Sequence, residues 1–238
     1  ILNPKFLSTF HPYQEIAVGG GSVFEHPDLI PFLENLKKQK VIANITVHQV
    51  HFMQNLELIR KMIEEKLVYG IGVSVSAPTD ELLSALSEFP NAVCHVINGI
   101  WNERVAEMMV DKNLKVLILG YKELRRGNDY LSIYDKNVNK NKKWLYDNLS
   151  ELLKKFKLIS FDNLAIEQLN VKRLLSDEEW ESFYQGDDGT STFYIDAINQ
   201  KFARSSTAAF DKRYPIDNLS MDEMFKIITD EYRKEKSK

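Results

Sequence analysis

The sequence contains little cysteine, glycine or proline and no long apolar run. Of its 238 residues, one is cysteine, ten are glycine and seven are proline. The single thiol, Cys94, excludes a disulfide scaffold and any metal site built only from cysteines of this chain. No apolar run reaches the ~18 residues that a membrane span needs, and no signal peptide is visible. We therefore expect a cytoplasmic protein without a membrane partner.

An excess of charge of either sign is also lacking. Lys and Arg number 31 and Asp and Glu number 34, which gives a net charge of −3. This slight acidity argues against a whole-chain nucleic-acid binder. With 44% apolar and 27% charged residues, the composition is that of a globular protein. Because the first residue is Ile1, we expect that residues upstream are missing.

Short apolar segments alternate with amphipathic ones along most of the chain. This alternation predicts an α/β fold with a mostly parallel sheet, built either as an open doubly wound sheet or as a barrel. Apolar runs such as residues 116–119 predict strands that are buried on both faces. Thr79 is expected to cap a helix. The expected strands are residues 13–18, 41–47, 68–76, 92–97, 115–119 and 158–166; the other expected helices are about 27–38, 55–65, 103–110 and 142–156, after a long loop at 121–142.

The tail of the chain has a different pattern. We expect a short helix at residues 177–184, a turn at 186–189 and a hairpin that pairs 192–198 with 201–205. A final helix is expected at residues 221–236. The tail is thus an α+β appendage at residues 171–238, after a core at residues 1–170.

The carboxyl ends of parallel strands are where ligands bind in such folds, and three glycines follow the first expected strand. Gly19, Gly20 and Gly21 would let the backbone turn tightly and approach a ligand closely. They form neither a dinucleotide fingerprint nor a Walker loop. A plain tight turn explains them about as well.

Histidines form the second candidate site. His48 and His51 follow a strand, and with His95 and Asp162 they could hold a metal ion at a barrel mouth. This arrangement would give a metal-dependent hydrolase. Histidines at such positions are more often hydrogen-bonding residues of the core or the mouth.

The remaining candidate groups are a basic cluster and the lone thiol. Lys122, Arg125 and Arg126 follow the fifth strand and could meet a phosphate or carboxylate of a substrate, or lie in a solvated loop. Cys94 is expected to be a small buried hydrophobe rather than a nucleophile.

One stretch, residues 17–29, resembles the second strand and loop of radical S-adenosylmethionine (radical SAM) enzymes. In that superfamily a Gly-Gly-Glu-Pro loop precedes a segment that ends in His-Pro-Asp. Here Gly20-Gly21-Ser22-Val23 matches the loop, and His26-Pro27-Asp28 is in register with the segment. The similarity covers about residues 10–170 and is greatest to an uncharacterised bacterial and phage branch.

The resemblance implies a partial (β/α)6 barrel, similar to a TIM barrel, that binds S-adenosylmethionine at its mouth. Ser22 stands where the family has Glu, so contacts there would rely more on the backbone. The expected substrate-binding residues are Lys122, Arg125, Arg126, Asp162 and Asn163. The expected cofactor-binding residues are Gly19, Gly20, Gly21, Ser22, Thr46, His48, Gln49, Ser74, Ser76 and Asn98.

The family's [4Fe–4S] cluster is bound by a Cys-x3-Cys-x2-Cys loop after the first strand, which this sequence lacks. Either that strand and loop lie upstream of Ile1, which the first residue favours, or the protein has lost them. In both cases this chain would supply no metal ligand. With the cluster, such an enzyme takes electrons from a flavodoxin or ferredoxin and generates a 5′-deoxyadenosyl radical that attacks a small-molecule or peptide substrate. The two alternatives are the metal-dependent hydrolase and a non-catalytic barrel that binds a ligand or a partner.

Overall fold

A six-stranded sheet forms the centre of the computed structural model, which describes residues 4–124 and 126–237. Every neighbouring pair of strands is parallel, and the strands follow chain order from one edge to the other. The predicted α/β fold with a parallel sheet is therefore confirmed. A doubly wound sheet is excluded because its strand order reverses in the middle. The strands are β1 (Glu15–Val18), β2 (Ile42–His48), β3 (Gly70–Ser74), β4 (Ala92–Ile97), β5 (Lys115–Leu119) and β6 (Leu158–Phe161).

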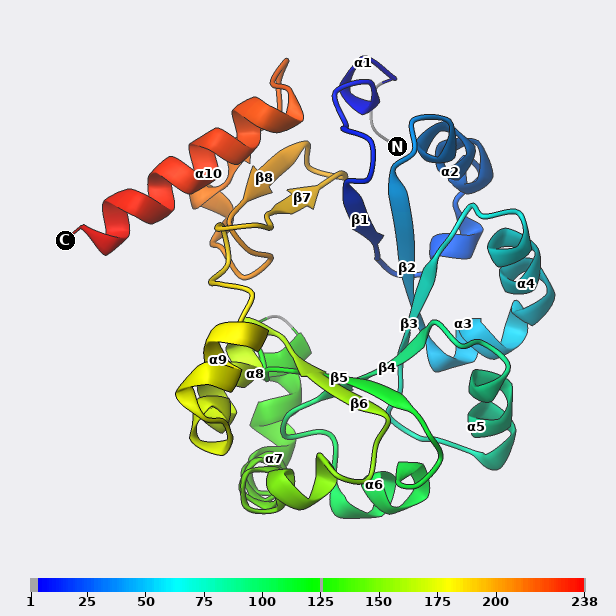
Figure 1. The fold of residues 1–238 in the computed structure, drawn as a ribbon, viewed down its shortest axis with the longest axis vertical. Coiled ribbons are helices and arrows are strands. Elements are labelled where there is room, and N and C mark those ends of the chain that lie inside the picture. The colour runs from blue at the N-terminus through cyan, green and yellow to red at the C-terminus, as the bar shows by residue number, and fades with distance from the viewer. Residues whose placement is uncertain (1–3, 125, 238) are drawn as a thin grey trace.

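The sheet curves into an arc with its helices on the outside (Figure 1). Two short helices, α1 (Pro4–Leu7) and η1 (Val23–Glu25), flank β1. The helices that follow the strands are α2 (Leu29–Lys38), α3 (Gln49–Gln54), α4 (Leu56–Glu64), α5 (Asp80–Ser87), α6 (Glu103–Met109), α7 (Arg126–Leu152) and α8 (Asn163–Leu169).

The two faces of the sheet differ in burial. In β2, Ala43, Ile45 and Val47 are buried against the outer helices, whereas Asn44 and Thr46 on the concave face are only partly buried. The same alternation holds in β5, where Leu117 and Leu119 are partly buried. The prediction that these strands are buried on both faces was therefore wrong, because the described helices pack on the convex face alone. The concave face is left available for a site.

Local sequence signals explain most helix starts. The Thr79 side chain accepts a hydrogen bond from the Leu82 N–H at 3.2 Å, which confirms the predicted cap of α5. Asp162 caps α8 in the same way, so β6 ends at Phe161 and the prediction of one strand over 158–166 was wrong. The apolar residues that follow Asp162 continue as a helix and not as a strand. Ala165 and Leu169 form the buried side of α8.

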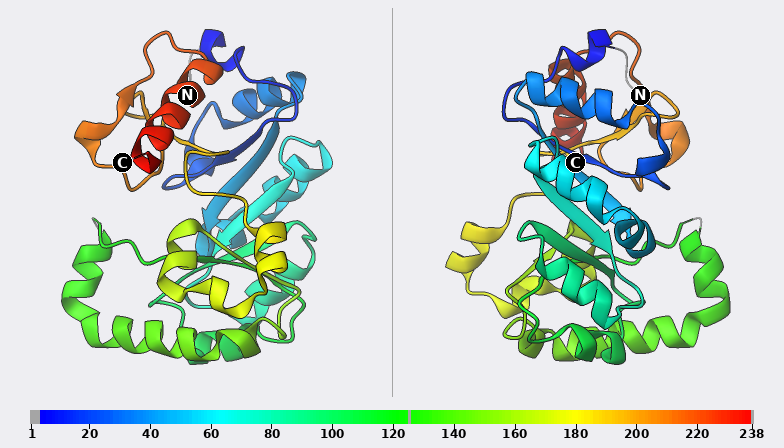
Figure 2. Two further views of the ribbon diagram at one scale, coloured as in Figure 1. Left: turned by 60° about the vertical axis from the view of Figure 1, so that its left-hand side comes forward. Right: turned by 90° about the vertical axis from the view of Figure 1, so that its right-hand side faces the viewer.

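One loop prediction needed correction, and one helix was not predicted. The expected loop at 121–142 is largely helical, since α7 runs over Arg126–Leu152 with non-helical backbone angles at Tyr134. Figure 2 shows α7 bent into two segments, the first standing away from the sheet. The Lys and Asn residues that suggested a loop lie on a solvated helix surface. The helix expected at 55–65 is confirmed as α4, and a further helix that was not predicted, α3, precedes it and ends next to Asn55.

The tail forms a small α+β unit. After η2 (Val171–Leu174) and α9 (Asp177–Phe183), β7 (Tyr194–Asp196) and β8 (Lys201–Ala203) form the predicted hairpin. A short third strand, β9 (Tyr214–Pro215), pairs with β8 and was not predicted. η3 (Phe210–Lys212) precedes β9, and α10 (Met221–Lys236) ends the chain. We call residues 192–237 the C-terminal module.

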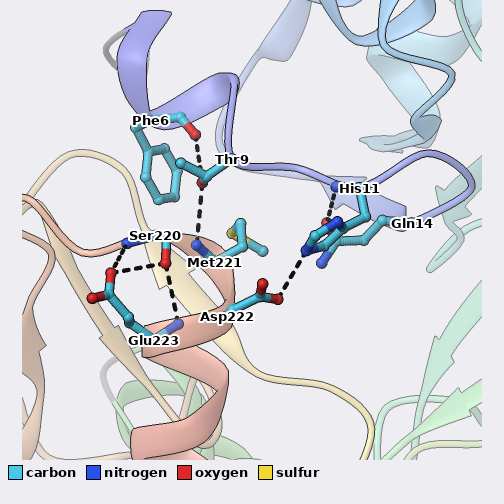
Figure 3. A network of polar contacts seen from close by, with 8 residues as sticks. All are labelled: Phe6, Thr9, His11, Gln14, Ser220, Met221, Asp222 and Glu223. Atoms are coloured by element: carbon cyan, nitrogen blue, oxygen red, sulfur yellow. Dashed lines mark hydrogen bonds and ion pairs between the residues drawn. The ribbon is translucent and has the colours of Figure 1, made fainter.

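The C-terminal module contacts the segment that leads into β1. The Thr9 hydroxyl accepts a hydrogen bond from the Met221 N–H at 3.1 Å, and His11 Nε2 lies 2.9 Å from a carboxylate oxygen of Asp222 (Figure 3). The start of α10 is itself capped by Ser220 and Glu223. Buried side chains of the module, including Phe202, Met224 and Ile228, belong to the same apolar cluster as the sheet. Thr9 and Met221, which are 212 positions apart in sequence, thus hold the N-terminal segment against the start of α10.

None of the helices in the described part of the chain combines the length and the apolar character that a membrane crossing requires.

Candidate functional site

A large cavity of about 2560 Å³ lies between the sheet and the C-terminal module. One wall consists of β1 and the glycine loop that follows it, and a second wall consists of the segments after β5 and β6. The C-terminal module forms the remaining wall through β7 and the loop after β8. The expected site residues that line this cavity are Gly19, Gly20, Gly21, Ser22, Thr46, Lys122, Asp162 and Asn163.

The glycine loop presents bare backbone to the cavity. A Cβ atom added at Gly20 or Gly21 would meet no heavy atom within 4 Å, so packing does not require glycine at either position. A Cβ atom at Gly19 would stand 3.9 Å from Thr46 Cβ, which brings the loop against the concave end of β2. Ser22 begins η1 without a side-chain capping bond. Glycine is nevertheless favoured at position 20, where φ is +159°, a backbone conformation that L side chains rarely adopt.

The concave face next to the loop carries His95. Its imidazole ring lies across β3 over Gly72, where an added Cβ would stand 2.3 Å from His95 Cε1 and 2.9 Å from Thr46 Oγ1. Glycine at position 72 thus lets His95 and Thr46 approach each other from two different strands. Burial lowers the pKa of His95 below its usual value, because desolvation disfavours the charged ring. Among the described residues, the ring nitrogens of His95 have no hydrogen-bond partner.

Asp162 and Gln168 organise the carboxyl ends of β5 and β6. One oxygen of Asp162 accepts hydrogen bonds from the N–H groups of Ala165, at 2.7 Å, and Gly120, at 2.8 Å. The Gln168 side chain accepts from the Tyr121 N–H and donates to the Tyr121 carbonyl, both at 2.9 Å. Asp162 thus ties the segment after β5 to the start of α8 at the edge of the cavity.

Asn98 lies away from the cavity wall. It is 1% exposed, and its side-chain nitrogen donates to Gln168 Oε1 at 2.9 Å. Its side-chain oxygen is buried without a partner in the described part of the structure. Asn98 thus helps to hold the carboxyl ends of β4 and β5 in place.

Lys122 and Asn163 connect the sheet to the tail across the cavity. Lys122 Nζ donates to the Ser206 hydroxyl at 3.1 Å, and Asn163 Nδ2 donates to Asp188 at 2.9 Å. The cavity is therefore bounded by polar contacts from segments far apart in sequence. Of the two arginines expected here, Arg125 lies outside the described residues and Arg126 begins α7.

The other expected cofactor residues do not line the cavity. His48 caps α3, and the Gln49 side chain bonds to the backbone of Ser76 and Ala77, which holds the loop after β3. Ser74 ends β3 opposite His48 and His95 in the strand register. Gln49 and Ser76 thus contact each other instead of the cavity.

The four residues of the expected metal site are not gathered. His48 and His51 are neighbours, with ring centroids 6.3 Å apart. Asp162 lies beyond β4 and β5 at the other edge of the sheet. Within residues 4–124 and 126–237, no three His, Cys, Asp or Glu side chains are placed to hold one metal ion.

The lone thiol faces away from the site. Cys94 is 1% exposed and lies on the helix-covered face of β4, opposite to His95. Burial raises the pKa of its thiol to about 12. The expectation of a buried, unreactive cysteine agrees with this environment.

A cluster of side chains around the Asp187 carboxylate holds α10 against the loop before β7. The Asp187 carboxylate accepts hydrogen bonds from the hydroxyls of Tyr184 and Tyr232. It also forms an ion pair with Lys236, whose Nζ lies 3.1 Å from Asp187 Oδ2. These donors, Tyr184 foremost, lower the pKa of Asp187 to about 2. Burial and Asp187 raise the pKa of Tyr184 to about 12. The cluster thus keeps one wall of the cavity in place.

Sequence reasoning did not single out any residue of the C-terminal module as part of the site. The loop over Ser205, Ser206 and Thr207 is polar in sequence, but only the contact of Ser206 with Lys122 shows which way it faces. Gly72 was also missed, although a glycine inside an apolar strand signals a close approach by another group. That signal could have drawn attention to His95.

In comparisons with known proteins, no family model, no curated protein and no solved structure matches the chain.

Proposed function

We propose that this chain is a partial (β/α)6 barrel of the radical SAM type and that its cavity binds S-adenosylmethionine. The observation that carries the proposal is the approach of Gly19 to Thr46 in the wall of the cavity, where a Cβ atom added to the glycine would stand 3.9 Å from Thr46 Cβ. It joins two segments of the resemblance, the glycine loop and the end of the next strand. The sequential order of six parallel strands is the order that a barrel requires.

The glycine loop suits the methionine end of the cofactor. Exposed peptide groups at Gly20 and Gly21 can accept hydrogen bonds from an ammonium group without interference from side chains. Ser22 adds a hydroxyl where the family has a carboxylate. Thr46 contributes a second hydroxyl from β2, and His95 adds a neutral imidazole beside it.

The residues of this chain do not fit an iron–sulfur cluster. A [4Fe–4S] cluster needs several thiolates, and the only cysteine, Cys94, is buried on the opposite face of the sheet with its pKa raised to about 12. We therefore derive no radical step from these residues. The proposed role of the chain is to bind and orient the cofactor and to exclude water around it.

Calorimetric titration with S-adenosylmethionine tests the proposal. In the Gly21→Val variant, the added side chain enters open cavity space, so it should block the cofactor without disturbing the fold. We expect binding by the natural chain and loss of at least about tenfold in affinity in this variant, since a buried clash costs about 1.4 kcal/mol or more.

The matched control is Glu25→Val, which adds the same side chain at an exposed position outside the cavity. It should bind the cofactor like the natural chain. Absence of binding by the natural chain, or equal binding by Gly21→Val, would overturn the proposal.

A further inference from the structure

The loop after β8 and the segment after β5 together resemble a receptor for an anion. Three hydroxyl groups, those of Ser205, Ser206 and Thr207, follow one another on the loop and line the cavity. Lys122 reaches them from the opposite wall, with its ammonium group 3.1 Å from the Ser206 hydroxyl. Lys212, at the end of η3, lines the same cavity.

These two lysines are cations without carboxylate partners. In the described chain, neither Lys122 nor Lys212 lies within ion-pair distance of an Asp or Glu. Near the hydroxyl loop, Asp196 is paired with Arg213 and Glu235 with Arg204. Elsewhere in the cavity, Asp162 and Asp188 accept hydrogen bonds from neutral groups and keep their negative charge. The ammonium group of Lys122 therefore brings a positive charge without a carboxylate partner directly to the loop hydroxyls.

A buried arginine holds the hydroxyl loop in its conformation. Arg213 is 7% exposed, and it donates to the carbonyl oxygens of Ser206, at 3.2 Å, and Ala208, at 3.1 Å. A third bond, of 2.8 Å, goes to Asp196, which is 8% exposed and also accepts two bonds from Asn199. Burying a charge pair is costly, and the hydrogen bonds that both groups make to each other and to their neighbours offset that cost here.

The hydroxyls are ordered as well. Thr207 donates its N–H to the Ser205 hydroxyl at 3.2 Å, and the two side-chain oxygens of these residues lie 2.6 Å apart. Ser206 stands between them and points its hydroxyl at Lys122. A hydroxyl can both donate and accept, so this group can turn its proton towards an incoming anion while Lys122 supplies the charge.

We propose that Lys122 and the loop hydroxyls form a subsite that binds an oxyanion, the phosphate or carboxylate group of a ligand, with Lys212 lining the same cavity. The subsite and the glycine loop line the same cavity. The identification of this ligand as the substrate rests on the proposed function, and it makes the substrate an anionic molecule. Binding of a simple anion itself does not depend on S-adenosylmethionine.

Titration of the ¹⁵N-labelled chain with inorganic phosphate tests the subsite by nuclear magnetic resonance. Ionic strength is held constant with sodium chloride, so that general screening does not change. We expect saturable shifts of the amide signals of residues 205–208. A parallel titration with acetate separates the sources: stronger binding of phosphate indicates a phosphorylated ligand, and stronger binding of acetate indicates a carboxylate.

Two variants and a control complete the experiment. Lys122→Met removes the charge but keeps an extended apolar chain, and it should weaken phosphate binding about fivefold or more. Ser206→Ala should weaken it less. Lys157→Met, at the opposite end of β6, should bind like the natural chain.

The subsite is overturned if neither anion gives a saturable shift at residues 205–208, or if Lys157→Met loses binding as much as Lys122→Met. Because no cofactor is present in this titration, its failure is distinct from failure of S-adenosylmethionine binding.

Discussion

The imidazole ring of His95 lies over the backbone of Gly72, so close that a Cβ atom at position 72 would stand 2.3 Å from the ring. The ring belongs to β4 and the glycine to β3, and Thr46 approaches the same point from β2. One absent side chain therefore lets the concave face bring a histidine and a hydroxyl together from strands on either side of β3. This grouping adjoins the glycine loop through Thr46.

The close approach of His95 to Gly72 predicts that alanine at position 72 destabilises the fold, whereas alanine at a glycine in open space does not. Gly72→Ala should lower the free energy of unfolding by about 1–3 kcal/mol, because the new methyl group overlaps His95 and Thr46. Urea unfolding followed by circular dichroism measures this cost. Gly21→Ala, in open space, is the control and should change stability by less than about 0.5 kcal/mol. If the double variant Gly72→Ala/His95→Ala is no less destabilised than the sum of its parts, the ring is not the source of the strain.

The environment of His95 predicts a pH dependence of stability. Because its pKa is lowered in the folded state, the unfolded chain binds a proton at a higher pH than the folded chain does. Stability should therefore fall as pH decreases from the ordinary value of 6.5 to the folded pKa, and the contribution should be constant outside this window. His95→Gln should flatten the slope of unfolding free energy against pH in that window. Titration of the His95 ring signals by nuclear magnetic resonance would contradict this if the folded pKa were at or above 6.5.

The buried ion pair of the C-terminal module predicts a large cost for removing one partner. Arg213→Met leaves the Asp196 carboxylate buried without its cation and should destabilise the module by about 3–5 kcal/mol. Arg204→Met is the matched control, since its partner Glu235 is largely exposed, and it should cost less than about 1 kcal/mol. Hydrogen exchange resolves the module from the rest of the chain. Equal protection of β8 in both variants would contradict the prediction.

Cys94 should resist chemical modification in the folded protein. Its side chain is 1% exposed and its pKa is raised to about 12, so almost no thiolate is present at neutral pH. We expect no adduct by mass spectrometry after treatment with iodoacetamide, and full labelling in urea. Rapid labelling of the folded chain would show that β4 opens readily or that the thiol faces solvent.

Much of the fold was predictable because its signals are local. The apolar segments that became β2, β4 and β5 and the capping residue Thr79 are readable within a few residues of sequence, and the structure has them where they were expected. The errors came where local signals compete. At residues 158–166 the Asp162 cap ended the strand early, and at 126–137 a polar composition concealed a solvated helix.

The site was predictable only in part, for a reason of geometry. The rule that ligands bind at the carboxyl ends of parallel strands selected the glycine loop, Thr46, Lys122, Asp162 and Asn163, which all line the cavity. The same rule selected Gln49 and Ser76, whose polar groups bond to each other's loops. Sequence position cannot tell a side chain that faces a cavity from one that holds a neighbouring loop.

By itself, the sequence determined the alternation of strands and helices, the parallel sheet and the absence of a thiolate cluster from this chain, because composition and periodicity act over short distances. Only the tertiary structure decided that strand order is sequential and that the tail forms a wall of the cavity. It also decided that Ser206 meets Lys122 and that His95 lies over Gly72. These contacts join residues from different strands or from opposite parts of the chain, and their partners are chosen by packing of the whole molecule.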